Sequence, residues 1–253
     1  MSDLAFIIGS DHNLMAICVT VVVDEIARDR ELLPENTCVI HVQDRVCGRS
    51  LLINCGGSPS ALLNNCEKLN IDIYDVDVVV LTSVSVRYWS SLKFLLKRTR
   101  RNTTVVYPYC NNFQMYNIES LCRRLKIRNV ALAQSIDLCS HVKLLLVNVT
   151  STYAEIQVEL RGEDKSLVVS IPNLGAAADP DRLLMIKTNL QLCSIPLSPL
   201  MLDYAIIVRR LCTRARSYTT VYMCNPTPLE VRKELRDRCS AFRDSYVGLR
   251  LSL

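Results

Sequence analysis

Residues 51–92 read LLINCGGSPSALLNNCEKLNIDIYDVDVVVLTSVSVRYWSSL, and this stretch decides the fold. It starts in an apolar run over 50–54 that is typical of a strand. Ser58 and Pro59 then predict the start of a helix, because serine caps a helix N-terminus and proline fits its first position. The largely apolar run over 76–81 predicts a buried strand. A strand, a helix and a second buried strand in this order indicate an α/β protein.

Working outward, strand-like and helix-like segments alternate along the whole chain, without a linker or an internal repeat. Strands are predicted over 16–23, 38–42, 103–107, 142–149, 154–160, 166–171, 204–208, 219–223 and 246–253. Further helices are predicted over 90–101, 118–127, 179–190 and 227–239, the last from a capping box at Thr227-Pro228-Leu229-Glu230. We therefore expect residues 1–253 to form a single domain with two sheets covered by helices.

The composition excludes several classes of protein. Apolar residues make up 49% of the chain and charged residues 22%, which is ordinary for a globular protein and rules out disorder. The net charge of +5 permits an acidic partner without demanding one. Only 7 of 253 residues are glycine, where about 7% is typical, and this shortage argues against a rich set of catalytic loops.

The chain contains 12 cysteines and no Cys-x-x-Cys pair, which excludes a zinc ribbon and a thioredoxin-type motif. The N-terminus lacks a signal peptide, and the longest apolar run, 14–23, is too short to span a bilayer. We expect a cytoplasmic protein with no membrane segment. Its cysteines would then act mainly as small buried hydrophobic residues, although disulfide pairing stays open.

The 51–92 stretch resembles the core of the metallo-β-lactamase superfamily. In that family a strand ending in Asp-x-Gly leads into a helix, and a second strand runs into a loop of pattern Ser-His-x-His-x-Asp-His-x-Gly-Gly-Leu. The chain is most similar to the archaeal branch that resembles dihydropterin-type synthases, and a weak similarity extends along its whole length. The resemblance implies a four-layer αββα sandwich.

The residues at the family's metal-binding positions differ from the family pattern. When the chain is aligned on Leu81 and Leu92, the family's strand-end aspartate falls on Asn54 and its late histidine on Asn225. The four loop ligands of the family fall, in order, on Ser83, Ser85, Arg87 and Tyr88. The family's middle metal ligand, expected just after the strand 166–171, falls on residues 172–174, which contain no histidine. Hydrolysis in this fold needs a divalent ion to activate water, and serine binds such an ion poorly while arginine repels it. The resemblance therefore implies an inactive pseudoenzyme with no catalytic residue, metal or cofactor.

Three other interpretations of the site remain open. Cys55 and Cys224, joined by His41 or His12, would form a rewired metal site. Ser83 or Ser85 would act as a nucleophile, although neither has a histidine or lysine base nearby in sequence. Arg87 would replace the lost metal by pairing with a buried carboxylate or an anionic ligand.

The leading functional hypothesis is a protein-interaction or scaffolding subunit that uses the old cleft or its rim. Tyr88 and Trp89 would suit a protein contact if exposed, or fill the vacated cavity if buried. The alternative is a subunit that binds RNA or DNA through basic clusters, for which the candidate residues are Lys97, Arg98, Arg100, Arg101, Arg209 and Arg210. The partner and the oligomeric state are not predicted.

Overall fold

The structure is a computed structural model. It describes residues 17–147, 149–171, 190–193, 208–209, 211–213, 220–224 and 227–253. Among these residues, no helix is both long and apolar enough to cross a membrane.

The first sheet has seven strands in the order β14-β1-β2-β3-β4-β5-β6. Their bounds are β14 (Arg250–Ser252), β1 (Ile17–Val23), β2 (Val39–Asp44), β3 (Arg49–Ile53), β4 (Val78–Val80), β5 (Thr104–Pro108) and β6 (Arg128–Leu132). Strands β3 to β6 run parallel, whereas β14, β1, β2 and β3 pair antiparallel. The carboxyl ends of β3 to β6 therefore lie at one edge, and the β2–β3 turn lies at the opposite edge.

The second sheet also has seven strands, in the order β13-β12-β11-β10-β9-β8-β7. Their bounds are β13 (Phe242–Asp244), β12 (Thr220–Met223), β11 (Leu190–Cys193), β10 (Ser166–Ser170), β9 (Glu155–Arg161), β8 (Val142–Val147) and β7 (Ile136–Cys139). Strands β8 and β9, both predicted as strands, pair antiparallel, with Val142 opposite Leu160.

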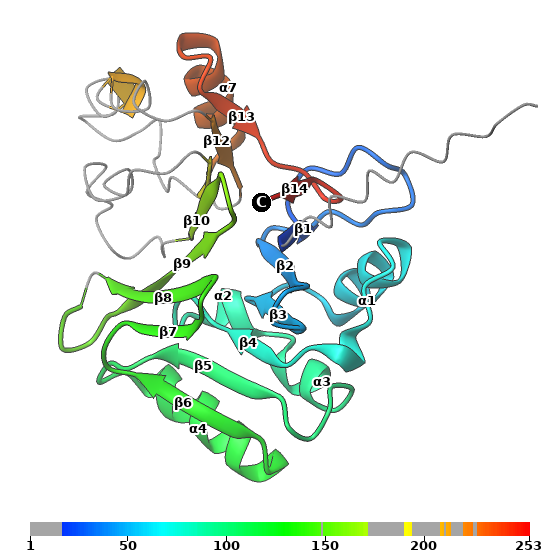
Figure 1. Ribbon diagram of the computed structural model, residues 1–253, viewed down its shortest axis with the longest axis vertical. Coiled ribbons are helices and arrows are strands. Elements are labelled where there is room, and N and C mark those ends of the chain that lie inside the picture. Colours follow the sequence, from blue (N-terminus) through cyan, green and yellow to red (C-terminus); the bar gives the residue numbers. More distant parts are fainter. Residues whose placement is uncertain are drawn as a thin grey trace, which may run out of the picture.

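Helices cover the outer face of each sheet (Figure 1). Their bounds are α1 (Pro59–Lys68), α2 (Val86–Trp89), α3 (Leu92–Leu96), α4 (Phe113–Leu125) and α7 (Leu229–Arg238), with a 3-10 turn, η1, at Ile73–Asp75. Helix α1 begins as predicted, because the Ser58 side chain accepts a hydrogen bond from the backbone N–H of Ala61.

Three apolar clusters define the layers. The first lies between the sheets and includes Ile40 of β2 and Val158 of β9. The second packs α1, α3 and α4 on the outer face of the first sheet, with Leu62 as a buried member. The third packs α7 on the second sheet through Val231 and Leu235. The chain is thus a four-layer αββα sandwich, and the predicted fold class is confirmed.

Several predicted element boundaries are wrong. Only Leu92–Leu96 (α3) of the helix expected over 90–101 is helical, and the short helix α2 just before it was not predicted. Helix α4 begins five residues before its predicted start because Asn112 caps it. Strands β6 and β7 were not expected at all. Their side chains are only partly buried along much of their length, so the apolar pattern that marks a strand is weak.

In the second half, the helix predicted from Thr227 begins at Leu229. Pro228, in an extended backbone conformation, is the N-cap of α7, and its side chain has no polar atom that could cap the helix. Leu190 begins a strand, and Val208 lies in a helical turn where a strand end was expected. The remainder of the predicted segments 179–190 and 204–208 lies outside the described residues.

Candidate functional site

The expected site lies at the carboxyl edge of the parallel strands β3 and β4. Asn54 follows β3 with a φ of 62° and is fully buried. Its side-chain oxygen accepts hydrogen bonds from the backbone N–H of Thr82 at 2.9 Å and from the Thr82 hydroxyl at 3.1 Å. That hydroxyl also lies 3.2 Å from the carbonyl oxygen of Ile171. The Thr82 hydroxyl thus lies between Asn54 and the end of β10 in the second sheet, and the amide adds no negative charge.

The two loop serines do not form a nucleophilic site. Ser83 is fully buried, and its hydroxyl oxygen accepts a hydrogen bond from the backbone N–H of Ser85 at 3.4 Å. No histidine of the described chain lies beside them, because the ring of His41 contacts Ser50 and His141 lies at the other end of the sandwich. A serine without a base is a weak nucleophile.

Arg87 does not pair with a buried carboxylate, which corrects one form of its predicted role. Its Nε donates to the carbonyl oxygen of Asn36 at 3.2 Å, and its Nη2 donates to Asn36 Oδ1 at 2.5 Å. The guanidinium therefore contacts a neutral loop residue near the surface. Its backbone also constrains the site, since a Cβ on Gly56 would lie 1.7 Å from the Arg87 carbonyl oxygen.

Tyr88 is fully buried in the apolar cluster between the two sheets. Its backbone carbonyl accepts a hydrogen bond from the N–H of Cys55 at 2.8 Å, and burial raises the pKa of its hydroxyl. Trp89 is half-buried and donates from its indole N–H to the carbonyl of Val84 at 2.8 Å. Tyr88 thus fills the interior, whereas Trp89 is partly exposed and its indole N–H is bonded within the chain.

A buried ion pair lies next to this region. Asp24 and Arg232 are 0% and 1% exposed, and Arg232 Nη2 lies 3.1 Å from Asp24 Oδ1. The Ser245 hydroxyl donates to the other carboxylate oxygen, and Arg232 Nε donates to the Thr227 carbonyl at 2.9 Å. Burial raises the pKa of Asp24, while Arg232 and Ser245 oppose this shift. The buried carboxylate of Asp24 is therefore already paired with an arginine.

The rewired site built on Cys55 and Cys224 does not form. Cys55 is buried in the cluster beneath the helices of the first sheet, whereas Cys224 is buried between the sheets. Burial also raises the pKa of the Cys55 thiol, so it does not supply a thiolate readily. Asn225 lies outside the described residues, as does His12.

The described residues do not fit the divalent ions that this type of site holds in hydrolases of this fold. Asn54, Ser83 and Tyr88 offer an amide, a hydroxyl and a phenol there, whereas such ions require imidazole and carboxylate ligands.

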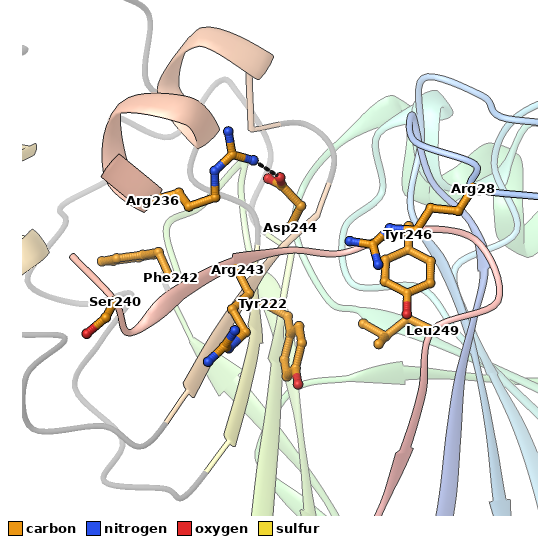
Figure 2. Close-up of a pocket in the computed structure, with 9 residues that line it drawn as sticks. All are labelled: Arg28, Tyr222, Arg236, Ser240, Phe242, Arg243, Asp244, Tyr246 and Leu249. Atoms are coloured by element: carbon orange, nitrogen blue, oxygen red, sulfur yellow. Dashed lines mark hydrogen bonds and ion pairs between the residues drawn. The ribbon is translucent and has the colours of Figure 1, made fainter. Parts of the chain in front are cut away.

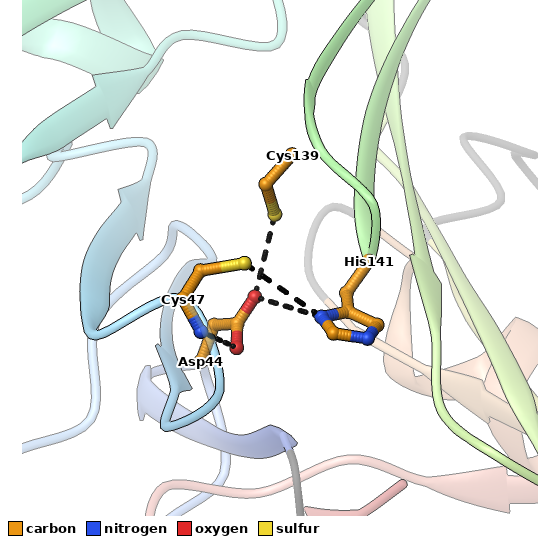
Figure 3. Close-up of side chains that lie close together, drawn as sticks. All are labelled: Asp44, Cys47, Cys139 and His141. Carbon is orange, nitrogen blue, oxygen red and sulfur yellow. Dashed lines mark hydrogen bonds and ion pairs between the residues drawn. The ribbon is translucent and has the colours of Figure 1, made fainter.

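A second group of polar side chains lies at the opposite end of the sandwich, and the sequence analysis missed it (Figure 3). It consists of Asp44, Cys47, Cys139 and His141, whose ligand atoms all lie within 4.8 Å of one another. The neighbouring Cys139 thiol and the Asp44 carboxylate, together with burial, raise the pKa of Cys47 to about 11. The sequence signals for this group are weak. Cys47 follows Asp44 by three residues, and a Cys-x-His pattern begins at Cys139, 95 residues after Asp44.

A pocket of about 490 Å³ lies beside β13 and the segment that leads to β14 (Figure 2). Arg236 forms an ion pair with Asp244 at its wall, and the guanidinium of Arg28 lies 3.8 Å from the ring centre of Tyr246. None of the residues predicted for the site lines this pocket.

Comparison with solved structures shows the fold. The metallo-beta-lactamase fold protein YhfI from Bacillus subtilis matches with a TM-score of 0.66 and 12% identity over 94% of this chain and 99% of that chain. Tm1679, described as a metal-dependent hydrolase of the beta-lactamase superfamily, matches with a TM-score of 0.69 and 13% identity over 94% and 99%. Human tRNase Z, short form, matches with a TM-score of 0.60 and 10% identity over 93% and 98%.

The described architecture and these matches identify the fold as the metallo-β-lactamase fold. No protein-family model matches the chain, and no curated protein matches it by sequence.

Proposed function

We propose that this chain is a non-catalytic, cytoplasmic member of the metallo-β-lactamase superfamily, close to its archaeal dihydropterin-synthase-like branch, that acts as a protein-binding or scaffolding subunit. The observation that carries the proposal is the complete burial of Tyr88, at the position of a loop histidine, inside the core between the sheets. A tyrosine buried there strengthens the packing where an active relative needs an accessible ion.

The rim of the same edge offers an exposed aromatic surface, which we call the rim surface. It consists of Tyr109, Phe113 and Tyr116, which are 55%, 74% and 52% exposed. Tyr109 follows the carboxyl end of β5, and Phe113 and Tyr116 lie at the start of α4. The Tyr116 hydroxyl lies 3.5 Å from Oδ1 of Asn111 in the loop between them. Exposed aromatic side chains are enriched at the energetic centres of protein interfaces, so these three supply the contact that Tyr88 and Trp89 do not.

Nucleic-acid binding through one continuous basic face receives no support from the described contacts. In the cluster after α3, Arg100 pairs with Asp75 and the Arg98 guanidinium stacks over Phe94 at 3.6 Å. Lys97 and Arg101 are exposed beside them. Arg209 is exposed next to the cluster that covers the second sheet, while Arg210 lies outside the described residues. Arg209, the described member of the second cluster, thus belongs to the outer layer opposite the first cluster.

The test is affinity purification from the native cells with nuclease and high salt, comparing the wild type with a Y109S/F113S/Y116S variant. We expect a stoichiometric protein partner that survives nuclease and is lost in the variant. Tyr74→Ser is the matched control, because Tyr74 is 58% exposed but lies before β4, at the other end of the strand. Retention of every partner by the triple variant would exclude the rim surface, and loss of all partners on nuclease treatment would favour the nucleic-acid alternative.

Catalysis is tested separately with bis(p-nitrophenyl) phosphate in the presence of Zn²⁺ or Mn²⁺. We expect no turnover above buffer. Turnover that is abolished by Tyr88→Ala or Asn54→Ala would contradict the non-catalytic assignment.

A further inference from the structure

The group of Asp44, Cys47, Cys139 and His141 joins the two sheets at the end of the sandwich away from Asn54. Asp44 is the last residue of β2, and Cys47 lies in the turn that leads to β3 of the first sheet. Cys139 is the last residue of β7, and His141 lies in the turn that leads to β8 of the second sheet. In Figure 3 the four side chains point toward one common centre.

The spacings between these atoms are those of ligands around one tetrahedral ion. Cys47 Sγ lies 3.8 Å from His141 Nδ1, Cys139 Sγ lies 3.4 Å from Asp44 Oδ2, and His141 Nδ1 lies 3.5 Å from the same oxygen. With metal–sulfur bonds of about 2.3 Å and metal–nitrogen or metal–oxygen bonds of about 2.0 Å, tetrahedral geometry requires separations of about 3.3 to 3.8 Å. All three distances agree with this to within a few tenths of an ångström.

The surroundings of Asp44 hold its carboxylate in the orientation that a ligand needs. Asp44 is fully buried, and its Oδ1 accepts hydrogen bonds from the backbone N–H groups of Val46 at 3.0 Å and Cys47 at 2.9 Å. Oδ2 is left facing the Cys139 thiol and the His141 ring. Hydrogen bonds to the carboxylate oxygen that does not bind the metal fix the orientation of the ligating side chain, and they are usual around metal centres. The Ser140 hydroxyl, 3.4 Å from His141 Nδ1, competes only weakly at that distance.

The geometry points to a Zn²⁺ site formed by Asp44, Cys47, Cys139 and His141, which ties the β2–β3 turn to the β7–β8 turn. Two thiolates, an imidazole and a carboxylate complete four-coordination, so the site is structural and leaves no position for water or substrate. Binding forms four metal–ligand bonds and releases the two thiol protons to solvent. The site is independent of the proposed protein-binding function.

Zinc content is the direct test. Wild-type protein, loaded with Zn²⁺ under reducing conditions and dialysed, should retain about one ion per chain by elemental analysis, falling below about a tenth in Cys47→Ser and in Cys139→Ser. Cys18→Ser is the matched control, because Cys18 is a half-buried cysteine of β1 outside the group, and Cys224→Ser tests the rewired alternative. Both controls should keep the ion.

Two further measurements keep the test decisive if a variant fails to fold. Co²⁺ bound to the wild type should give the strong visible bands and the thiolate-to-cobalt charge-transfer band of a tetrahedral site with two sulfur ligands, and Zn²⁺ should remove them. A chelator should lower the Tm of the zinc-loaded wild type and leave Cys47→Ser unchanged. Three outcomes would each overturn the proposal. The wild type would retain no zinc, Cys224→Ser would lose zinc as fully as Cys47→Ser does, or a Cys47–Cys139 disulfide would persist under reducing conditions.

Discussion

The two ends of the sandwich differ in what their side chains offer chemically. At the carboxyl edge of β3 and β4, the backbone follows the metallo-β-lactamase fold, but amide, hydroxyl and phenol groups are buried and hydrogen-bonded to one another or packed in the core. At the opposite end, two short turns bring Asp44, Cys47, Cys139 and His141 within reach of a common centre. One fold thus presents buried neutral groups at one end and, at the other, the four side chains for which we propose a zinc ion.

The largest effect is expected from Arg232→Met, which tests how the first end is held together. Removing the guanidinium leaves the buried carboxylate of Asp24 without its charge partner, so unfolding should become easier by about 3–5 kcal/mol. Arg123→Met is the control, since Arg123 pairs with Glu119 on the surface of α4 and should change stability by less than about 0.5 kcal/mol. Equal effects in urea denaturation would mean that the buried pair does not stabilise this end.

Tyr88 tests whether the first end is a packed core. Tyr88→Ala should cost about 3–5 kcal/mol because it leaves a cavity between the sheets. Tyr88→Phe keeps the ring and should cost about 1 kcal/mol. If Tyr88→Ala costs no more than Tyr74→Ala, a change at an exposed tyrosine, the region is an open cleft and the comparison between the two ends fails.

His41 gives a pH dependence that must be separated from any effect of zinc. Burial lowers its pKa from 6.5 to about 4, so the folded chain favours the neutral ring. Stability from this group is complete above pH 6.5 and is lost as the pH falls from 6.5 to about 4, by about 3 kcal/mol in all. In His41→Gln that part of the acid destabilisation should disappear. If the difference in unfolding free energy between the wild type and His41→Gln stayed constant between pH 7 and pH 4, the role of His41 would be refuted.

The local elements of the first end were predictable because their signals lie close together in sequence. Ser58 and Pro59 start α1 as expected, and the largely apolar run 76–81 contains β4. Asn54 and the loop 82–88 meet because parallel strands bring their carboxyl ends to one edge. Arg87 was misjudged, since its charge suggested an ionic partner while the loop path directs it to Asn36.

The amino-acid sequence by itself determined the α/β class, the resemblance to the metallo-β-lactamase core and the absence of the family's ligand types from the aligned positions. These properties reside in residue identity and in spacings within one strand–helix–strand unit. Only the tertiary structure decided that Cys55 and Cys224 lie in different layers, that Tyr88 is buried, and that Asp44 meets His141. Such pairings depend on how two sheets stack, because the contacts join residues tens of positions apart, and no local pattern encodes that distance.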